Sequence, residues 1–230
     1  MALRYTYVFP YLFRKILPKS RPLAGAGKSK LASRVISSFV EERQTHEGLA
    51  YFYCNRGDDS RQRPLQVLSS FVRQLSLLHI PPDGYLIQEP INSIYNQVLN
   101  EGEALNGLTY AQAESLLPRL LEAFASSTII LDALDECERS TRLRLIKTMK
   151  SLVDKCGHLK ILITSRRDSD IESCLQSQDT VELGATENES DIRLFVRSEL
   201  DRRVEEGGKR LSLKLREEII DTLDMQSGGM

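Results

Sequence analysis

The spacing of apolar residues changes along the chain, and the change separates expected helices from expected strands. Apolar residues recur at helical spacing from Leu31 to Val40, which predicts an amphipathic helix running to about Arg43. The run 49–54 is short, apolar and aromatic, which predicts a buried strand. Helix and strand therefore follow one another within the first quarter of the chain.

The same alternation continues downstream. Pro64 sits well in the first turn of a helix, Thr109 and Gln112 form an expected capping box, and Ser140 is an expected helix cap. Helices are predicted over 64–75, 91–99, 109–124, 140–153, 192–200 and 215–223, and strands over 128–132, 159–164 and 180–183. Alternating strands and helices predict an α/β fold with three layers (α/β/α) and a mostly parallel sheet, followed by the start of a helical subdomain.

The chain is expected to divide into a poorly structured basic leader at 1–22, an α/β core at 23–185 and a truncated helical subdomain at 186–230. The leader contains no acid, since the first acidic residue is Glu41. The alternatives for it are the ragged end of a fragment or a mitochondrial presequence. No apolar run approaches the roughly 18 residues of a membrane helix, so no membrane partner is expected.

Composition narrows the class of protein. Hydrophobic residues make up 41% of the chain, which permits a sizeable core, and the net charge of −1 argues against nucleic-acid binding. The four cysteines are widely spaced and lack a C-x-x-C pair. This pattern favours a reduced, cytoplasmic protein over a disulfide framework or a zinc site.

A glycine-rich segment at the mouth of the first helix predicts a phosphate-binding loop. Backbone N–H groups at a helix N-terminus attract anions, glycines allow close approach, and lysine neutralises the outer phosphates. The candidate nucleotide-binding residues are Gly25, Ala26, Gly27, Lys28, Ser29 and Lys30. The pattern departs from G-x-x-x-x-G-K-[ST] at Pro22, and the segment before it lacks the apolar strand that should lead into the loop.

A second candidate segment follows the apolar strand 128–132. Asp132 at its carboxyl end is expected to bind Mg²⁺ together with Ser29, and Asp135 and Glu136 are candidates to activate a water. The strand 159–164 ends at Thr164, Ser165 and Arg166, any of which is placed to sense a γ-phosphate.

These segments together resemble the NACHT branch of the STAND signalling NTPases, and most closely its nephrocystin-like, fungal members that often carry ankyrin or other repeats. The resemblance rests on Ala24–Ser29, Ala50–Cys54, Ile129–Cys137 and Lys160–Arg166, and it extends from about Leu23 to the C-terminus. Its most specific motif is Asp132–Glu136, where a small residue follows the first acid and an acidic pair follows that.

The resemblance implies a signalling switch that binds Mg²⁺ with ATP or GTP and hydrolyses it slowly, with Asp135 as the catalytic acid and Arg166 as a sensor. It also implies protein partners or self-association through regions outside this chain. Two other functions stay open: a scaffold that no longer binds nucleotide, and a small-molecule P-loop kinase. The kinase would need a lid of clustered arginines, but Arg139, Arg142 and Arg144 are expected to be a solvated helix start.

Overall fold

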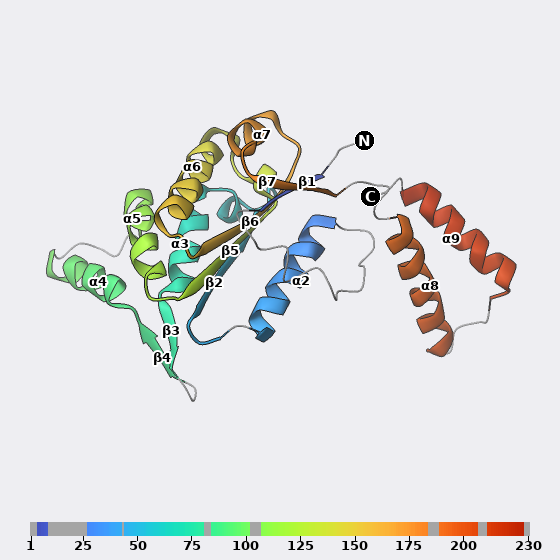
Figure 1. Ribbon diagram of the computed structural model, residues 1–230, viewed down its shortest axis with the longest axis horizontal. Helices are drawn as coiled ribbons and strands as arrows, with labels where there is room; N and C mark the ends of the chain where they lie inside the picture. Colours follow the sequence, from blue (N-terminus) through green and yellow to red (C-terminus); the bar gives the residue numbers. More distant parts are fainter. Residues whose placement is uncertain are drawn as a thin grey trace.

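The computed structural model describes residues 4–8, 27–42, 44–80, 84–101, 107–183, 189–206 and 211–227. A five-stranded sheet has the order β2-β5-β6-β1-β7, and β3 and β4 form a separate hairpin (Figure 1). The strands are β1 (Arg4–Val8), β2 (Glu47–Tyr53), β3 (Leu77–Ile80), β4 (Gly84–Ile87), β5 (Ser126–Asp132), β6 (Leu159–Arg166) and β7 (Asp179–Leu183).

The α-helices are α2 (Gly27–Glu42), α3 (Pro64–Leu75), α4 (Glu89–Glu101), α5 (Tyr110–Leu121), α6 (Arg139–Lys155), α7 (Ser169–Leu175), α8 (Glu189–Glu205) and α9 (Leu213–Ser227). Helices pack on both faces of the sheet, which makes three layers, while α8 and α9 lie apart from it (Figure 1). Single 3₁₀ turns, η1 (Asp59–Arg61) and η2 (Leu134–Glu136), follow β2 and β5. The predicted α/β fold class is confirmed.

The sheet is mostly parallel, as predicted. β5 is parallel to both β2 and β6, while β1 is antiparallel to β6 and to β7. Because β6 and β7 are both antiparallel to β1, they run in the same direction. The continuous apolar character of β5 and β6 follows from this position, since a central parallel strand is covered on both faces.

Strand β1 corrects the expectation that residues 1–22 form no regular element. Arg4–Val8 lies between β6 and β7, with Arg4 opposite Arg166 and Val8 opposite Leu162. The segment Arg-Tyr-Thr-Tyr-Val is rich in residues that favour strands, but it is too short for a periodic signal. The position between two strands supplies its hydrogen bonds on both sides.

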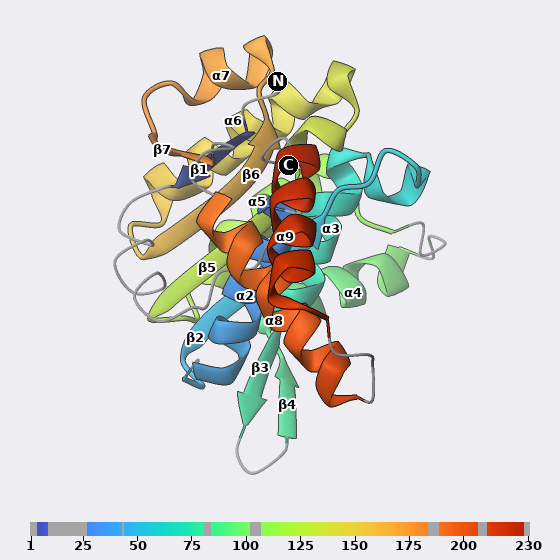
Figure 2. The same cartoon turned by 90° about the vertical axis from the view of Figure 1, so that its right-hand side faces the viewer.

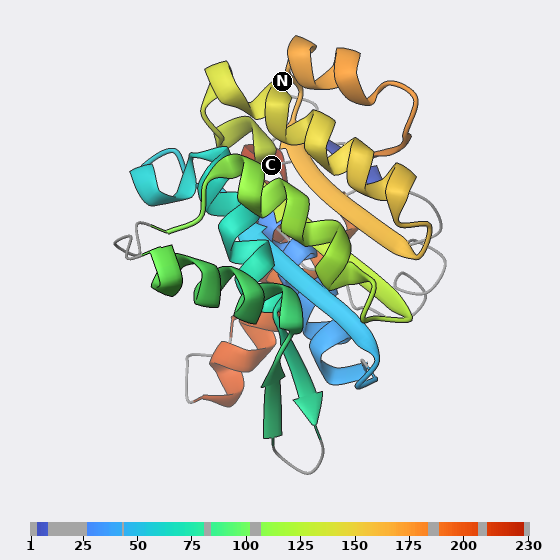
Figure 3. The ribbon, with the colours of Figure 1, turned by 90° about the vertical axis from the view of Figure 1, so that its left-hand side faces the viewer.

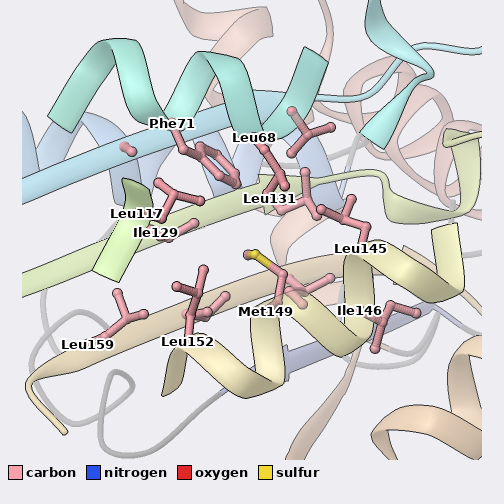
Figure 4. Close-up of a cluster of buried hydrophobic side chains, with 14 of the residues drawn as sticks. Leu68, Phe71, Leu117, Ile129, Leu131, Leu145, Ile146, Met149, Leu152 and Leu159 are labelled. Atoms are coloured by element: carbon pink, nitrogen blue, oxygen red, sulfur yellow. The ribbon is translucent and has the colours of Figure 1, made fainter. Parts of the chain in front are cut away.

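The two faces of the sheet are covered unequally. Helices α3, α5 and α6 pack on one face (Figure 3), where side chains of α3 and α6 meet above β5 (Figure 4). Helix α2 packs on the other face through a smaller buried cluster: Ala32, Val35, Ile36, Leu49, Ile130 and Leu162.

Two local predictions have different outcomes. The Thr109–Gln112 capping box is present at the start of α5. The predicted cap at Ser140 is wrong, because α6 begins at Arg139 with Glu138 before it and no side-chain cap. The N–H of Glu138 donates to the carbonyl of Gln62 at 3.0 Å, so a contact with the segment before α3 fixes the start of α6 instead.

Helices α8 and α9 form an antiparallel pair on the α2 side of the sheet (Figure 2). Ion pairs join Arg193 to Asp221 and Arg197 to Glu217. The later residue of α8 thus pairs with the earlier residue of α9, as expected for antiparallel helices. None of the helices in the described ranges is both long and apolar enough to cross a bilayer.

Candidate functional site

The carboxyl ends of β2, β5 and β6 meet at one edge of the sheet. Tyr53 pairs with Asp132 across β2 and β5, and Leu131 pairs with Ile163 across β5 and β6. Helix α2 starts at the same edge and carries no acidic residue in its first turn. A helix N-terminus without its own acid offers its unpaired N–H groups and the positive end of its dipole to an external anion.

Ser29 in the first turn of α2 contacts Asp132 directly. Its hydroxyl donates to Asp132 Oδ2 at 2.6 Å, although the two residues are 103 positions apart. The other carboxylate oxygen, Oδ1, accepts from the Thr164 hydroxyl at 2.5 Å. These two hydrogen bonds connect three polar side chains, one each from α2, β5 and β6. Asp132 and Thr164 are buried.

This arrangement fits a Mg²⁺ ion. Two oxygen ligands at right angles on Mg²⁺, each about 2.1 Å from the metal, lie about 3 Å apart. The Ser29 and Asp132 oxygens at 2.6 Å therefore need to separate by only about 0.4 Å to share one ion. Within the described residues no group of three or more His, Cys, Asp or Glu side chains gathers as a metal site. Mg²⁺ that keeps several waters and binds phosphate needs no such group.

Ala133 turns the chain from β5 into η2. Its backbone is left-handed, with φ 57° and ψ 49°, and its N–H donates to Thr164 Oγ1 at 2.9 Å. A β-branched side chain is strongly disfavoured in this region of backbone space, whereas alanine is tolerated. The small residue that follows Asp132 in the sequence motif thus has a structural cause.

The turn brings Asp135 back to the end of β6. Asp135 Oδ1 accepts the N–H of Arg166 at 2.7 Å, and Oδ2 lies 3.6 Å from the Arg166 guanidinium. The Asp135 side chain is buried, while that of Arg166 is largely exposed and is free to reach outward. Ser165 adds a long contact to Asp135 Oδ1 at 3.5 Å.

Glu136 points to a different partner, the loop after β2. Its carboxylate accepts the N–H of Arg56 at 3.1 Å, and the Arg56 guanidinium donates to the Asp135 carbonyl at 2.9 Å. Arg56 is not among the predicted site residues, because it lies between the predicted strand 49–54 and the predicted helix 64–75 and belongs to no motif. Its contacts hold the acidic turn from the β2 side.

Arg142 corrects the expectation that the start of α6 is solvated. Its side chain is only 2% exposed and binds Asp168 at 2.5 Å and both carboxylate oxygens of Asp170. A third contact reaches the Asp135 carbonyl at 3.4 Å. Arg142 therefore links α6, the loop after β6 and the acidic turn, while Arg139 nearby is exposed as expected.

Burial and ion pairing act in opposite directions on this cluster. Burial disfavours the charged form of Asp170, but the hydrogen bonds from Arg142 and the Arg142 charge outweigh it and lower the Asp170 pKa. For Arg142 burial also opposes the charge, and the two aspartates overcome it and raise the Arg142 pKa. Arg142 and Asp170 therefore stay ionised at neutral pH.

Two cysteines lie beside the site. The Sγ atoms of Cys54, which follows β2, and Cys137, which follows η2, are 2.9 Å apart, and both residues are buried. The hydrogen bond with Cys137 and burial raise the pKa of the Cys54 thiol.

The predicted site residues are thus placed in two groups. Ser29, Asp132 and Thr164 form one, and Asp135, Glu136 and Arg166 form the other, one turn of η2 away. Lys30 is exposed on α2. Gly27 and the backbone of Lys28 begin α2, whereas Gly25, Ala26 and the Lys28 side chain lie outside the described residues.

Comparison with protein-family models matches residues 22–166 to the family described as nephrocystin 3, N-terminal. The match covers more than half of the chain and contains every predicted site residue. This chain belongs to the nephrocystin 3 N-terminal family. Comparisons with curated proteins and with solved structures found no match.

Proposed function

We propose that this chain is a nucleoside-triphosphate-binding switch of the NACHT/STAND type, which binds ATP or GTP with Mg²⁺ and hydrolyses it slowly. The observation that carries the proposal is the contact of Ser29 with Asp132 at 2.6 Å, which joins the N-terminus of α2 to the carboxyl end of β5. A hydroxyl and a carboxylate held together at a helix N-terminus suit a metal-bound phosphate.

Different residues of the site bind the phosphates and the Mg²⁺ ion. The N–H groups of Gly27 and its neighbours in the first turn of α2 bind phosphate oxygens, and Lys28 neutralises the outer phosphates. Ser29 and Asp132 hold Mg²⁺, which when bound neutralises charge between the β- and γ-phosphates. Thr164 fixes the orientation of the Asp132 carboxylate through its 2.5 Å hydrogen bond.

Asp135 and Arg166 account for slow turnover. Asp135 is the candidate to orient the attacking water and hold its proton, but its carboxylate is engaged by the N–H and guanidinium of Arg166. The exposed Arg166 side chain has to move to reach a γ-phosphate, and that movement removes the guanidinium contact with Asp135 Oδ2 while the Arg166 N–H still binds Oδ1. Glu136 is fixed by Arg56 and shapes the turn.

The proposal extends to the setting of the switch. Partners would be other proteins or further copies, engaged through regions outside this chain, in the cytoplasm. The net charge of −1 gives no support for nucleic-acid binding.

One observation favours the alternative function of a scaffold that no longer binds nucleotide. Strand β1 is antiparallel to β6, so Val8 lies opposite Leu162, about 13 Å from the edge that carries the site. A phosphate loop usually follows directly from a parallel strand that ends at this edge. Here β1 runs the other way and ends at Val8, far from this edge, while α2 begins at it.

Equilibrium binding of fluorescent ATP and GTP analogues, with Mg²⁺ and with chelator, separates the two functions. Lys28→Ala is expected to weaken binding about tenfold to a hundredfold, because it removes a charge-assisted contact of about 1.5–3 kcal/mol. Asp132→Asn keeps the side-chain shape and is expected to remove the Mg²⁺ dependence. Arg34→Ala, a basic exposed position further along α2, is the matched control and should bind as the unmodified chain does.

Folded protein that shows no saturable binding of either analogue at high micromolar concentration would refute the switch and support the scaffold. Equal loss in Lys28→Ala and Arg34→Ala would also count against the site, because it would indicate a general charge effect on α2.

A further inference from the structure

The sulfur atoms of Cys54 and Cys137 are in contact although the residues are 83 positions apart. Cys54 directly follows β2, and its N–H donates to the Asp132 carbonyl at 3.0 Å. Cys137 closes η2, and its N–H donates to the Leu134 carbonyl at 3.1 Å. The pair thus bridges two adjacent strand ends, on the two segments that frame the acidic turn.

From this geometry we propose that Cys54 and Cys137 are a reversible redox modification site, at which a disulfide ties the turn carrying Asp135 and Glu136 to the end of β2. The Sγ–Sγ distance of 2.9 Å has to shorten by about 0.9 Å to reach the covalent length. Both backbone segments already converge on the same place, so the bond needs a local adjustment of η2 and no rearrangement of the sheet.

The oxidant that balances the reaction is a small peroxide such as hydrogen peroxide. One thiol attacks a peroxide oxygen, the O–O bond breaks, and the thiol proton passes to the leaving hydroxide, so that a sulfenic acid and water form. The second thiol then attacks the sulfenic sulfur, forming the S–S bond and releasing a second water. Two thiols lose two electrons and two protons in total, and a dithiol reductant reverses the change by thiol–disulfide exchange.

The other two cysteines provide an internal comparison. Cys156 is buried at the end of α6 and Cys174 is half-buried in α7. Neither of them contacts a second sulfur in the described ranges. Proximity therefore selects Cys54 and Cys137 for cross-linking, whereas burial alone would make Cys156 equivalent.

A cross-link here would restrain the acidic turn. The turn is held from the β6 side by Arg166 and from the β2 side by Arg56, both through non-covalent contacts. A disulfide adds a covalent restraint to these non-covalent contacts. It also lowers the conformational entropy of the unfolded chain, because it closes a long loop. We expect the oxidised protein to melt roughly 4–10 °C higher than the reduced protein.

The consequence for nucleotide rests on the proposed function. If Asp135 has to part from Arg166 for hydrolysis, a fixed η2 slows turnover in the oxidised form and leaves phosphate binding at Lys28 and Ser29 largely intact. The modification site itself does not depend on that function.

The test treats the full chain with hydrogen peroxide, blocks free thiols with an alkylating agent, and maps peptides by mass spectrometry without reduction. The expected result is a linked peptide pair containing Cys54 and Cys137, with loss of two hydrogen atoms, that disappears after dithiothreitol. Cys54→Ser and Cys137→Ser should each abolish it and the rise in melting temperature. Cys156→Ser is the matched control and should keep both.

Full alkylation of Cys54 and Cys137 in the oxidised, folded wild-type chain would overturn the proposal, as would a link from either to Cys156 or Cys174. Because the mapping uses the wild-type chain without nucleotide, neither a misfolded variant nor failure of the switch affects it. A cross-link that forms but leaves hydrolysis unchanged would refute the effect on turnover alone.

Discussion

The arginine–carboxylate pairs of two regions of this protein share their chemistry but differ in their exposure. Arg142 is 2% exposed and binds Asp168, in the loop after β6, and Asp170, in the first turn of α7, next to the candidate site. In the α8–α9 pair, Arg197 and Glu217 lie 3.2 Å apart with 49% and 54% of their side chains exposed. The pairs of Arg142 fix a backbone turn, whereas the Arg197–Glu217 pair lies on the surface of two helices.

The difference teaches where an ion pair matters. Around Arg142 solvent has limited access, since the Asp168 and Asp170 side chains are 25% and 21% exposed, so removal of the arginine leaves two partly buried carboxylates facing each other. Along α8 and α9 solvent screens each pair and takes over when one partner is lost. The buried pair should therefore affect stability and the site, whereas the exposed pairs should affect neither strongly.

The largest expected effect follows from Arg142→Met. This substitution should lower the free energy of unfolding by about 3–5 kcal/mol, since it leaves Asp170 without its partner and Asp168 with only the exposed Arg139 at 3.5 Å. Urea denaturation measures the change. Arg139→Met is the control on the same helix: its side chain is 73% exposed, and the expected loss is under about 1 kcal/mol. Equal losses of stability in the two variants would show that burial does not determine how much these arginines contribute.

Ala133→Val tests the same turn at a residue that makes no ion pair itself. A β-branched residue at φ 57° should cost about 1–3 kcal/mol and shift Asp135 away from Arg166. Ala133→Gly relieves the backbone constraint and should leave stability within about 1 kcal/mol of the wild type. Denaturation of both variants provides the check, and a valine variant as stable as the glycine variant would disprove the role of the left-handed turn.

Arg197→Met sharpens the comparison from the exposed side. It removes the contact to Glu217 between α8 and α9, and the expected loss is about 0.2–1 kcal/mol. The loss should vanish in high salt, where exposed charges are screened. A loss as large as that of Arg142→Met would show that exposure does not control the strength of these pairs.

The smallest effect is a difference in how two carboxylates respond to salt. Hydrogen bonds from Arg202 and Arg203, whose side chains are exposed, lower the pKa of Glu199 from 4.5 to about 2. A lowered folded-state pKa stabilises the protein above the unfolded value, so this contribution should disappear as the pH falls from about 4.5 to about 2. Asp170 also has a lowered pKa, and its contribution is lost as the pH falls below 3.8.

NMR titration of both side chains at low and high salt separates them. The Glu199 pKa should move toward its ordinary value in high salt, because solvent ions reach it, and the Asp170 pKa should hold. The opposite order would contradict the assignment of Asp170 to a protected cluster.

Much of the α/β core could be predicted from the sequence, because its signals are local. A few consecutive residues are enough to predict each strand or helix start: the apolar runs predict β5 and β6, and the Thr109 capping box predicts the start of α5. The expected neighbours Ser29 and Asp132 also follow from one rule, that an open α/β sheet binds ligands where the carboxyl ends of its strands meet helix N-termini. The structure brings these two together; what they bind remains a prediction.

The features that the sequence missed depend on distant partners. Arg142 belongs to a charged segment that looks solvated, and it is buried only because Asp168 and Asp170, 26 and 28 positions later, meet it. The contact of Cys54 with Cys137 has the same origin, since no spacing rule brings cysteines together from two different strand ends. Strand β1 carries too few residues to show a period of its own.

The place of β1 in the sheet has a consequence in time. The ribosome makes Arg4–Val8 before both of the strands that flank it, because β6 and β7 begin at Leu159 and Asp179. Until those strands have been made this segment lacks its sheet partners, whereas the sheet of β2, β5 and β6 can assemble without it. Of the five strands of the sheet, the one made earliest is therefore among the last to be docked, and it closes the sheet from within.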